Sequence, residues 1–133
     1  MNRIQIILIV AFSYLLFAAP MAFAADGTCT PAVEWSDIPS GIRAQVVQTV
    51  GGEVSPRGGP FNASDVTGDN VPQSRFLGAC LSAGQWTIAV ERGGIGYHMQ
   101  IIQFAGDVVA RTWTALVPEG GFTPKALAPP SAR

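Results

Sequence analysis

The chain is poor in charge and in histidine, and both shortages exclude classes of partner or site. Charged residues make up 13% of the 133 residues, with eight basic side chains against nine acidic ones. No run of lysine or arginine could follow a phosphate backbone, so we expect no nucleic acid and no anionic membrane surface as a partner. The single histidine, His98, cannot form a two-histidine metal site, which argues against zinc.

The sequence also lacks the short motifs that indicate common catalytic or cofactor sites. It contains no G-x-S-x-G and no C-x-x-C. NASDVTGDN (62–70) has the composition of a calcium loop, but counting from Asp65 puts Asn70 and Phe76 where an EF-hand needs Gly and Glu. The glycines of ERGGIGYHM (91–99) precede a strand-like run instead of a helix, unlike those of a phosphate-binding loop. We therefore expect no metal and no cofactor.

Long apolar runs are confined to the N-terminus. Residues 4–19 (IQIILIVAFSYLLFAA) are almost entirely apolar, and an A-x-A pattern follows at Ala22 and Ala24. This order predicts a secretory signal peptide, 1–24, with cleavage after Ala25 as the alternative. Because the run is shorter than the roughly 20 residues of a membrane span, we expect no stable membrane anchor after cleavage. The mature protein is then exported, either periplasmic or secreted.

Cysteine occurs only twice, at Cys29 and Cys80. An even number of cysteines in a small exported chain predicts a disulfide, and two cysteines allow one pairing. Closing a loop of about fifty residues contributes about 4 kcal/mol in the chain-entropy model, which is a large share of a small domain's stability.

We expect one α+β domain over 25–117, in which an N-terminal helix packs on a four-stranded antiparallel meander sheet. The helix is predicted over 38–50, because apolar residues recur there at every fourth position and form one stripe (Ile38, Ile42, Val46, Val50). Gly51 and Gly52 provide its end.

The rest of the chain divides into a loop, four strands and a tail. Residues 51–74 are rich in glycine, proline, asparagine, aspartate and serine, which predicts a long loop of the kind that is often functional. Runs of β-prone residues separated by short turns then predict four strands: RFLGACLS, QWTIAVER, YHMQIIQF and VVARTWTAL. Residues 118–133 contain four prolines and no periodicity, so we expect a Pro-rich flexible tail.

The turn between the second and third predicted strands combines glycines with four chemically distinctive residues, Glu91, Arg92, Tyr97 and His98. Arginine and tyrosine often anchor protein interfaces, because they join a large contact area to directional hydrogen bonds. We therefore predict that these four residues form a binding site, with the 51–74 loop as a second contact region.

These observations favour a small exported, non-catalytic protein that binds another exported or envelope protein. It would act as an inhibitor, an immunity-type protein or an accessory subunit. The alternative is a small exported hydrolase in which His98 acts with a loop carboxylate, such as Asp65 or Asp69, or with a loop serine, because catalytic groups meet in space and not in sequence. A catalytic His98 must lie within hydrogen-bond reach of such a partner.

Overall fold

The computed structural model describes residues 29–66 and 70–128. The predicted signal peptide, 1–24, lies outside the described residues. Among the helices that the structure does describe, none is long and apolar enough to cross a membrane. The elements are, in chain order, β1 (Thr30–Ala32), a 3-10 turn (Trp35–Asp37), α1 (Ser40–Val50), β2 (Val54–Ser55), β3 (Ser74–Ser82), β4 (Gln85–Arg92), β5 (His98–Ala105), β6 (Val108–Ala115) and a second 3-10 turn (Pro124–Leu127).

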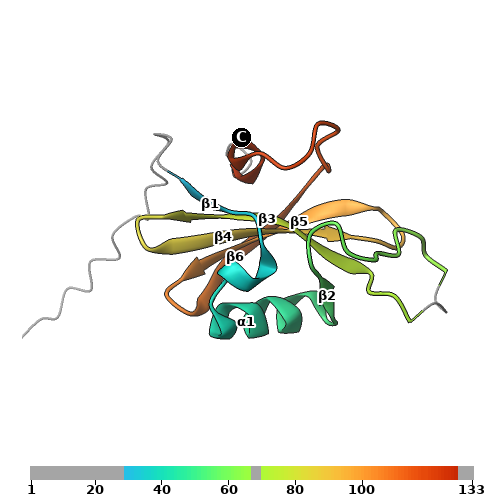
Figure 1. Ribbon diagram of the computed structural model, residues 1–133, viewed down its shortest axis with the longest axis horizontal. Helices are drawn as coiled ribbons and strands as arrows, with labels where there is room; N and C mark the ends of the chain where they lie inside the picture. The colour runs from blue at the N-terminus through green and yellow to red at the C-terminus, as the bar shows by residue number, and fades with distance from the viewer. Residues whose placement is uncertain (1–28, 67–69, 129–133) are drawn as a thin grey trace, which may run out of the picture.

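The predicted α+β architecture, with one helix on an antiparallel meander, is confirmed (Figure 1). Strands β3, β4, β5 and β6 pair in chain order, each antiparallel to the next. The sheet also has two short strands, and both lie on the outer edge of β3. Strand β1 pairs antiparallel with β3 from Thr30 opposite Leu81, and β2 pairs parallel with it from Val54 opposite Ser74.

Helix α1 covers one face of the sheet through the apolar stripe that its sequence predicts. Ile42, Val46 and Val50 are buried against strand residues such as Phe76 and Ile102. The helix begins at Ser40, two residues after the predicted start, because Pro39 and the residue before it are extended. It ends where Gly51 takes a φ of 75°, a conformation that glycine adopts without strain.

The C-terminal segment covers the opposite face of the sheet (Figure 1). Leu127 is buried there with Met99 and Ile101, and the ring of Phe122 lies so close to Gly78 that an added Cβ would collide with it. In the described part of the predicted tail, 118–128, apolar side chains complete a second core, and residues 129–133 lie outside the described residues. The central strands β4 and β5 are therefore covered on both faces, whereas β6 is largely exposed.

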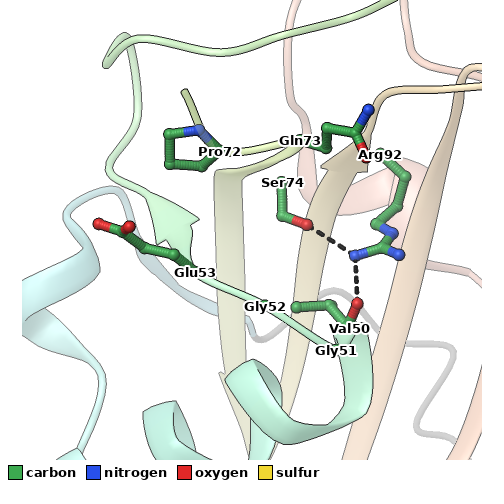
Figure 2. A pocket seen from close by; sticks show the side chains of 8 residues that line it. All are labelled: Val50, Gly51, Gly52, Glu53, Pro72, Gln73, Ser74 and Arg92. Atoms are coloured by element: carbon green, nitrogen blue, oxygen red, sulfur yellow. Dashed lines mark hydrogen bonds between the residues drawn. The ribbon is translucent and has the colours of Figure 1, made fainter. Parts of the chain in front are cut away.

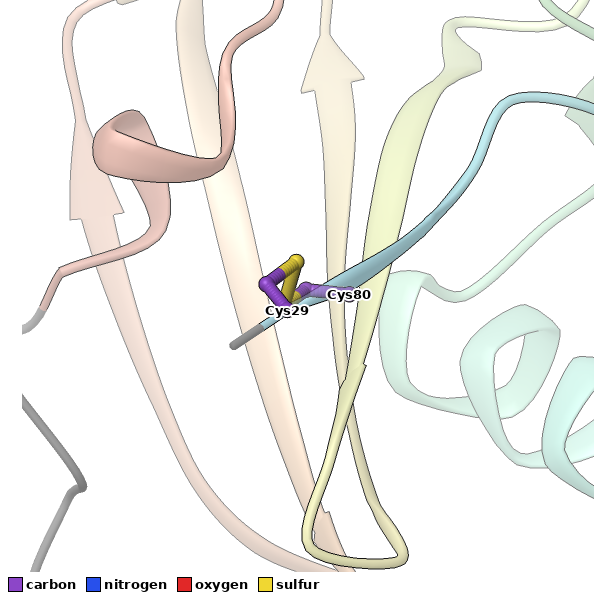
Figure 3. The surroundings of a disulfide bond; sticks show 2 residues. All are labelled: Cys29 and Cys80. Carbon is purple, nitrogen blue, oxygen red and sulfur yellow. A yellow bond between two sulfur atoms is a disulfide. The ribbon is translucent and has the colours of Figure 1, made fainter. Parts of the chain in front are cut away.

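The predicted disulfide joins Cys29 to Cys80 across 51 positions of sequence (Figure 3). Cys29 directly precedes β1, and Cys80 lies within β3 opposite Pro31. The bond therefore holds the N-terminal strand on the sheet edge. The cross-link secures a strand of only three residues, which has few ladder hydrogen bonds of its own.

Candidate functional site

The turn between β4 and β5 and the loop between β2 and β3 meet at one end of the sheet (Figure 1). The amide of Gly93 donates to the carbonyl of Gln73 at 2.8 Å, and that of Gly94 donates to the carbonyl of Ala63 at 3.2 Å. Gly93 has no space for a side chain, because a Cβ would collide with the carbonyl oxygen of Asn62. The two regions that the sequence singled out thus form one surface.

Asn62 organises the part of the loop that contacts the turn. Its Nδ2 donates to the carbonyl of Val66 at 2.9 Å, and its Oδ1 accepts from the amide and the hydroxyl of Ser64. The amide of Asn62 donates to Pro72 at 3.0 Å, and Gln73 Nε2 donates to the Ser64 carbonyl at 3.2 Å. These bonds satisfy local backbone groups in the way of an Asx turn and fix the shape of 62–66.

Glu91 is the buried centre of the surface, since its residue is only 3% exposed. Arg75 lies opposite it on β3 and gives two contacts to Oε2, from Nη2 at 2.7 Å and from Nε at 2.8 Å. The hydroxyl of Tyr97 donates to the other carboxylate oxygen, Oε1. Both oxygens of the buried carboxylate therefore have partners, as a buried charge requires.

Phe61 extends this group of contacts into the loop. The guanidinium carbon of Arg75 is 4.7 Å from the centre of the Phe61 ring, and the rings of Phe61 and Tyr97 are 6.3 Å apart. Desolvation, followed by the hydrogen bond to Glu91, raises the pKa of Tyr97 to about 12. We refer to Phe61, Arg75, Glu91 and Tyr97 as the Glu91 cluster. It links β3, β4, the turn and the loop.

Arg92 lies on the other face of the sheet and contacts the C-terminal end of helix α1 (Figure 2). Its Nη1 donates to the carbonyl of Val50 and to the hydroxyl of Ser74, both at 2.6 Å. A cation at this position satisfies a carbonyl at the helix C-terminus and complements the helix dipole. Burial lowers the pKa of Arg92. The residue borders an open cavity of about 210 Å³ lined by Val50, Gly51, Gly52, Glu53, Pro72, Gln73 and Ser74.

His98 lies opposite Arg92 at the start of β5. Its Nδ1 is 2.5 Å from the carbonyl oxygen of Gly96, so this nitrogen carries the proton and donates it. No hydrogen bond from His98 to a carboxylate or hydroxyl occurs within 29–66 and 70–128, and Asp69 lies outside those ranges. Within the same ranges, no three His, Cys, Asp or Glu side chains are grouped as a metal site.

The four predicted binding residues thus divide between the two faces. Glu91 and Tyr97 belong to the Glu91 cluster, whereas Arg92 and His98 lie on the face that α1 covers. Sequence reasoning missed Arg75, because the register of an unbroken hairpin would bring it opposite Arg92 and not opposite Glu91. It also passed over Ile95, whose isolation between glycines was visible in the sequence.

Comparison of the chain with protein-family models, with curated proteins and with solved structures gives no match. The function is therefore argued from the geometry of this end of the sheet.

Proposed function

We propose that the chain is an exported, non-catalytic protein that binds another exported or envelope protein, as an inhibitor, an immunity-type protein or an accessory subunit. The contact surface comprises the turn at 93–97 and the loop segment at 61–66. The predicted signal peptide at 1–24 supports the location of the partner, because it directs the chain to the compartment where the partner would be found.

The observation that carries the proposal is the group of exposed apolar and aromatic side chains at this end. Val66, Ile95 and Tyr97 are exposed there, and Phe61 lies beside Tyr97. Single exposed apolar residues are ordinary on protein surfaces, but several on adjoining, hydrogen-bonded segments favour a contact surface. The rings of Phe61 and Tyr97 add contact area. Because they are already held in place, the entropic cost of binding is lower.

The proposal assigns supporting roles to the two buried or inward-facing predicted residues. Glu91 accepts a hydrogen bond from the Tyr97 hydroxyl and so holds this side chain in place. Arg92 joins the end of α1 to the start of β3. Binding residues are best positioned when their neighbours lock their conformation. Arg92→Ala is therefore a poor test of binding, because it would disturb the helix as well as any contact.

Affinity capture tests the proposal directly. The chain, in the form in which the producing cells contain it, is immobilised and exposed to their envelope and secreted fractions, and retained proteins are identified by mass spectrometry. The surface variant is the double substitution Val66→Asp with Ile95→Asp. The control, Val108→Asp with Ala110→Asp, places the same charges on exposed residues near the opposite end of the sheet.

We expect a stoichiometric protein that the wild type and the control retain and that the surface variant loses. Retention of no protein, or loss of the retained protein from the control alone, would contradict the proposal. If the wild type, the control and the surface variant all retain the same partner, the contact lies elsewhere and the proposal loses its structural basis.

A further inference from the structure

We propose that strand β6 joins two copies of the chain into a dimer, in which the two sheets continue into each other across a two-fold axis. β6 is the last strand in the order β1-β3-β4-β5-β6. Within the described ranges, 29–66 and 70–128, only β5 pairs with it. The backbone groups on its outer side therefore have no strand partner there. The inference goes beyond the proposed function, because it concerns other residues and a second copy of the same chain.

The two edges of the sheet differ in how they are protected. At the other edge, β1 and β2 both pair with β3, and the Cys29–Cys80 disulfide secures β1. Open edges of native sheets usually carry proline, lysine or other charges, or a bulge that limits pairing. β6 (VVARTWTA) has no proline, no lysine and no acidic residue, and its one charged side chain, Arg111, lies over the ring of Trp113. The register with β5 shifts around Ala110, so the regular ladder, and the edge available for pairing, covers 111–115.

The outer edge of β6 is open on the face that α1 covers. Thr112 lies on this face, since it is opposite Ile102 of the core beneath the helix, and Thr114 follows on the same side. Both threonines are exposed, so the helix does not cover this part of the edge. Leu116, directly after the strand, is 87% exposed. A second strand laid along the edge would contact all three side chains.

The sequence of the strand is nearly symmetrical about Trp113, which makes it complementary to a second copy of itself. Residues 109–117 read VARTWTALV, with threonine on both sides of the tryptophan and valine at both ends. Antiparallel pairing about a two-fold axis at Trp113 places the two tryptophans opposite each other and Thr112 opposite the second copy's Thr114. Aromatic pairs and threonine pairs are among the cross-strand pairs that stabilise antiparallel sheets.

Charge favours this register. An axis at Arg111 would place two arginines opposite each other, which destabilises a sheet. With the axis at Trp113, Arg111 is opposite the second copy's Ala115, and the other arginine is four positions away, about 13 Å along the strand. The nearest acidic residues, Asp107 and Glu119, lie in turns before and after β6 and outside the ladder. The contact therefore contains no pair of like charges.

Association should stop at two copies. The two-fold contact uses the β6 edge of both chains, and the outer edge of β3 already carries β1 and β2. Because the paired strands run antiparallel, the two copies of the surface at 61–66 and 93–97 lie at opposite ends of the joined sheet. A ladder of this length makes a small interface, below the roughly 1,200 Å² of a standard one, and we expect a dissociation constant of about 10 µM.

Sedimentation velocity of the oxidised chain, in the form in which the producing cells contain it, tests the proposal. Between about 1 and about 200 µM the wild type should change from monomer to dimer. Thr112→Glu with Thr114→Glu places like charges opposite each other twice and should weaken association about tenfold or more. Thr112→Lys with Thr114→Glu places opposite charges there and should associate at least as tightly as the wild type. The second variant is the matched control for the first, and thermal unfolding checks that both keep the fold.

Several outcomes would overturn the proposal. A wild type that stays monomeric at about 200 µM has no such contact. A dimer that both variants retain equally uses another surface, and a dimer that both variants lose is not centred on Trp113. Species larger than a dimer would contradict the closed two-fold contact. If the wild type is monomeric and only Thr112→Glu with Thr114→Glu loses the protein found by affinity capture, the edge binds that partner instead of a second copy. The sedimentation test needs no captured protein, so failure of the proposed function leaves its result unchanged.

Discussion

The ion pair between Arg75 and Glu91 lies beneath the proposed contact surface, and replacing the arginine gives the sharpest test of the Glu91 cluster. In Arg75→Met, a side chain of similar length fills the space, but Glu91 loses two donors to Oε2 while its carboxylate stays buried. Removing one partner of a buried ion pair costs about 3 to 5 kcal/mol. Because the Arg75 side chain is 29% exposed, water can enter the vacated position, and we expect a loss near the lower end, about 3 kcal/mol.

Replacing the other partner of the ion pair, Glu91, should lower the free energy of unfolding by less. Glu91→Gln keeps the shape of the side chain and one oxygen acceptor, and it leaves Arg75 partly hydrated and stacked on Phe61. We expect a loss of about 1 to 2 kcal/mol, the cost of weakened hydrogen bonds to a charged group. The double substitution Arg75→Met with Glu91→Leu leaves no buried charge without a partner. It should therefore be more stable than Arg75→Met alone.

Urea unfolding of the oxidised chain, followed by tryptophan fluorescence, measures these differences. Trp35 and Trp86 pack against the core between α1 and the sheet, so their emission reports global unfolding. We expect Arg75→Met to lose more free energy of unfolding than Glu91→Gln. A larger loss for Glu91→Gln than for Arg75→Met would refute the argument that the buried carboxylate depends on Arg75. A double variant as unstable as Arg75→Met would refute it as well.

Three further predictions concern the helix end, the tyrosine and the C-terminal segment. Arg92→Ala removes the donor to Val50 and should cost about 2 kcal/mol in urea unfolding, whereas Arg92→Lys, which keeps the charge, should cost less. The difference in absorbance at 295 nm between wild type and Tyr97→Phe should titrate near pH 12, against about 10 for free tyrosine. Because Tyr97 has a higher pKa in the folded protein than in the unfolded chain, its protonated hydroxyl contributes to the free energy of unfolding. That contribution is complete below pH 10 and is lost as pH rises through about 12. Leu127→Ala should cost about 2 kcal/mol and speed tryptic cleavage at Lys125, because the segment that it anchors detaches; unchanged cleavage would contradict that anchoring role.

The helix and the four long strands were predictable because each carries its own periodic signal. The apolar stripe of α1 repeats over three turns, and the strands are eight or nine residues long with short turns between them. Strands β1 and β2, with three and two residues, are too short to show any alternation. Their place in the sheet comes from contacts with β3 and, for β1, from the disulfide.

The C-terminal segment was not predictable for a different reason. Phe122 and Leu127 are separated by polar residues and a proline, so the segment lacks a helical or strand period. What holds it is tertiary contact, because the ring of Phe122 occupies the space over Gly78 and Leu127 fills a gap beside Met99. Tertiary packing of this kind overrides local propensity, and a composition rich in glycine and proline conceals it.

A single backbone irregularity explains why only part of the candidate site could be predicted. The turn at Ala83 and Gly84 pairs Ser82 with Gln85, and an unbroken hairpin in that register would bring Arg75 opposite Arg92. Two like charges in such a pair destabilise a sheet. In the structure the register shifts by one residue between Phe76 and Gly78, in the manner of a β-bulge, so Arg75 faces Glu91 instead. The same shift leaves Arg92 free to cap α1 from the opposite face. The bulge therefore determines both which cation neutralises Glu91 and which one secures the helix, and a sequence pattern read strand by strand contains no signal for it.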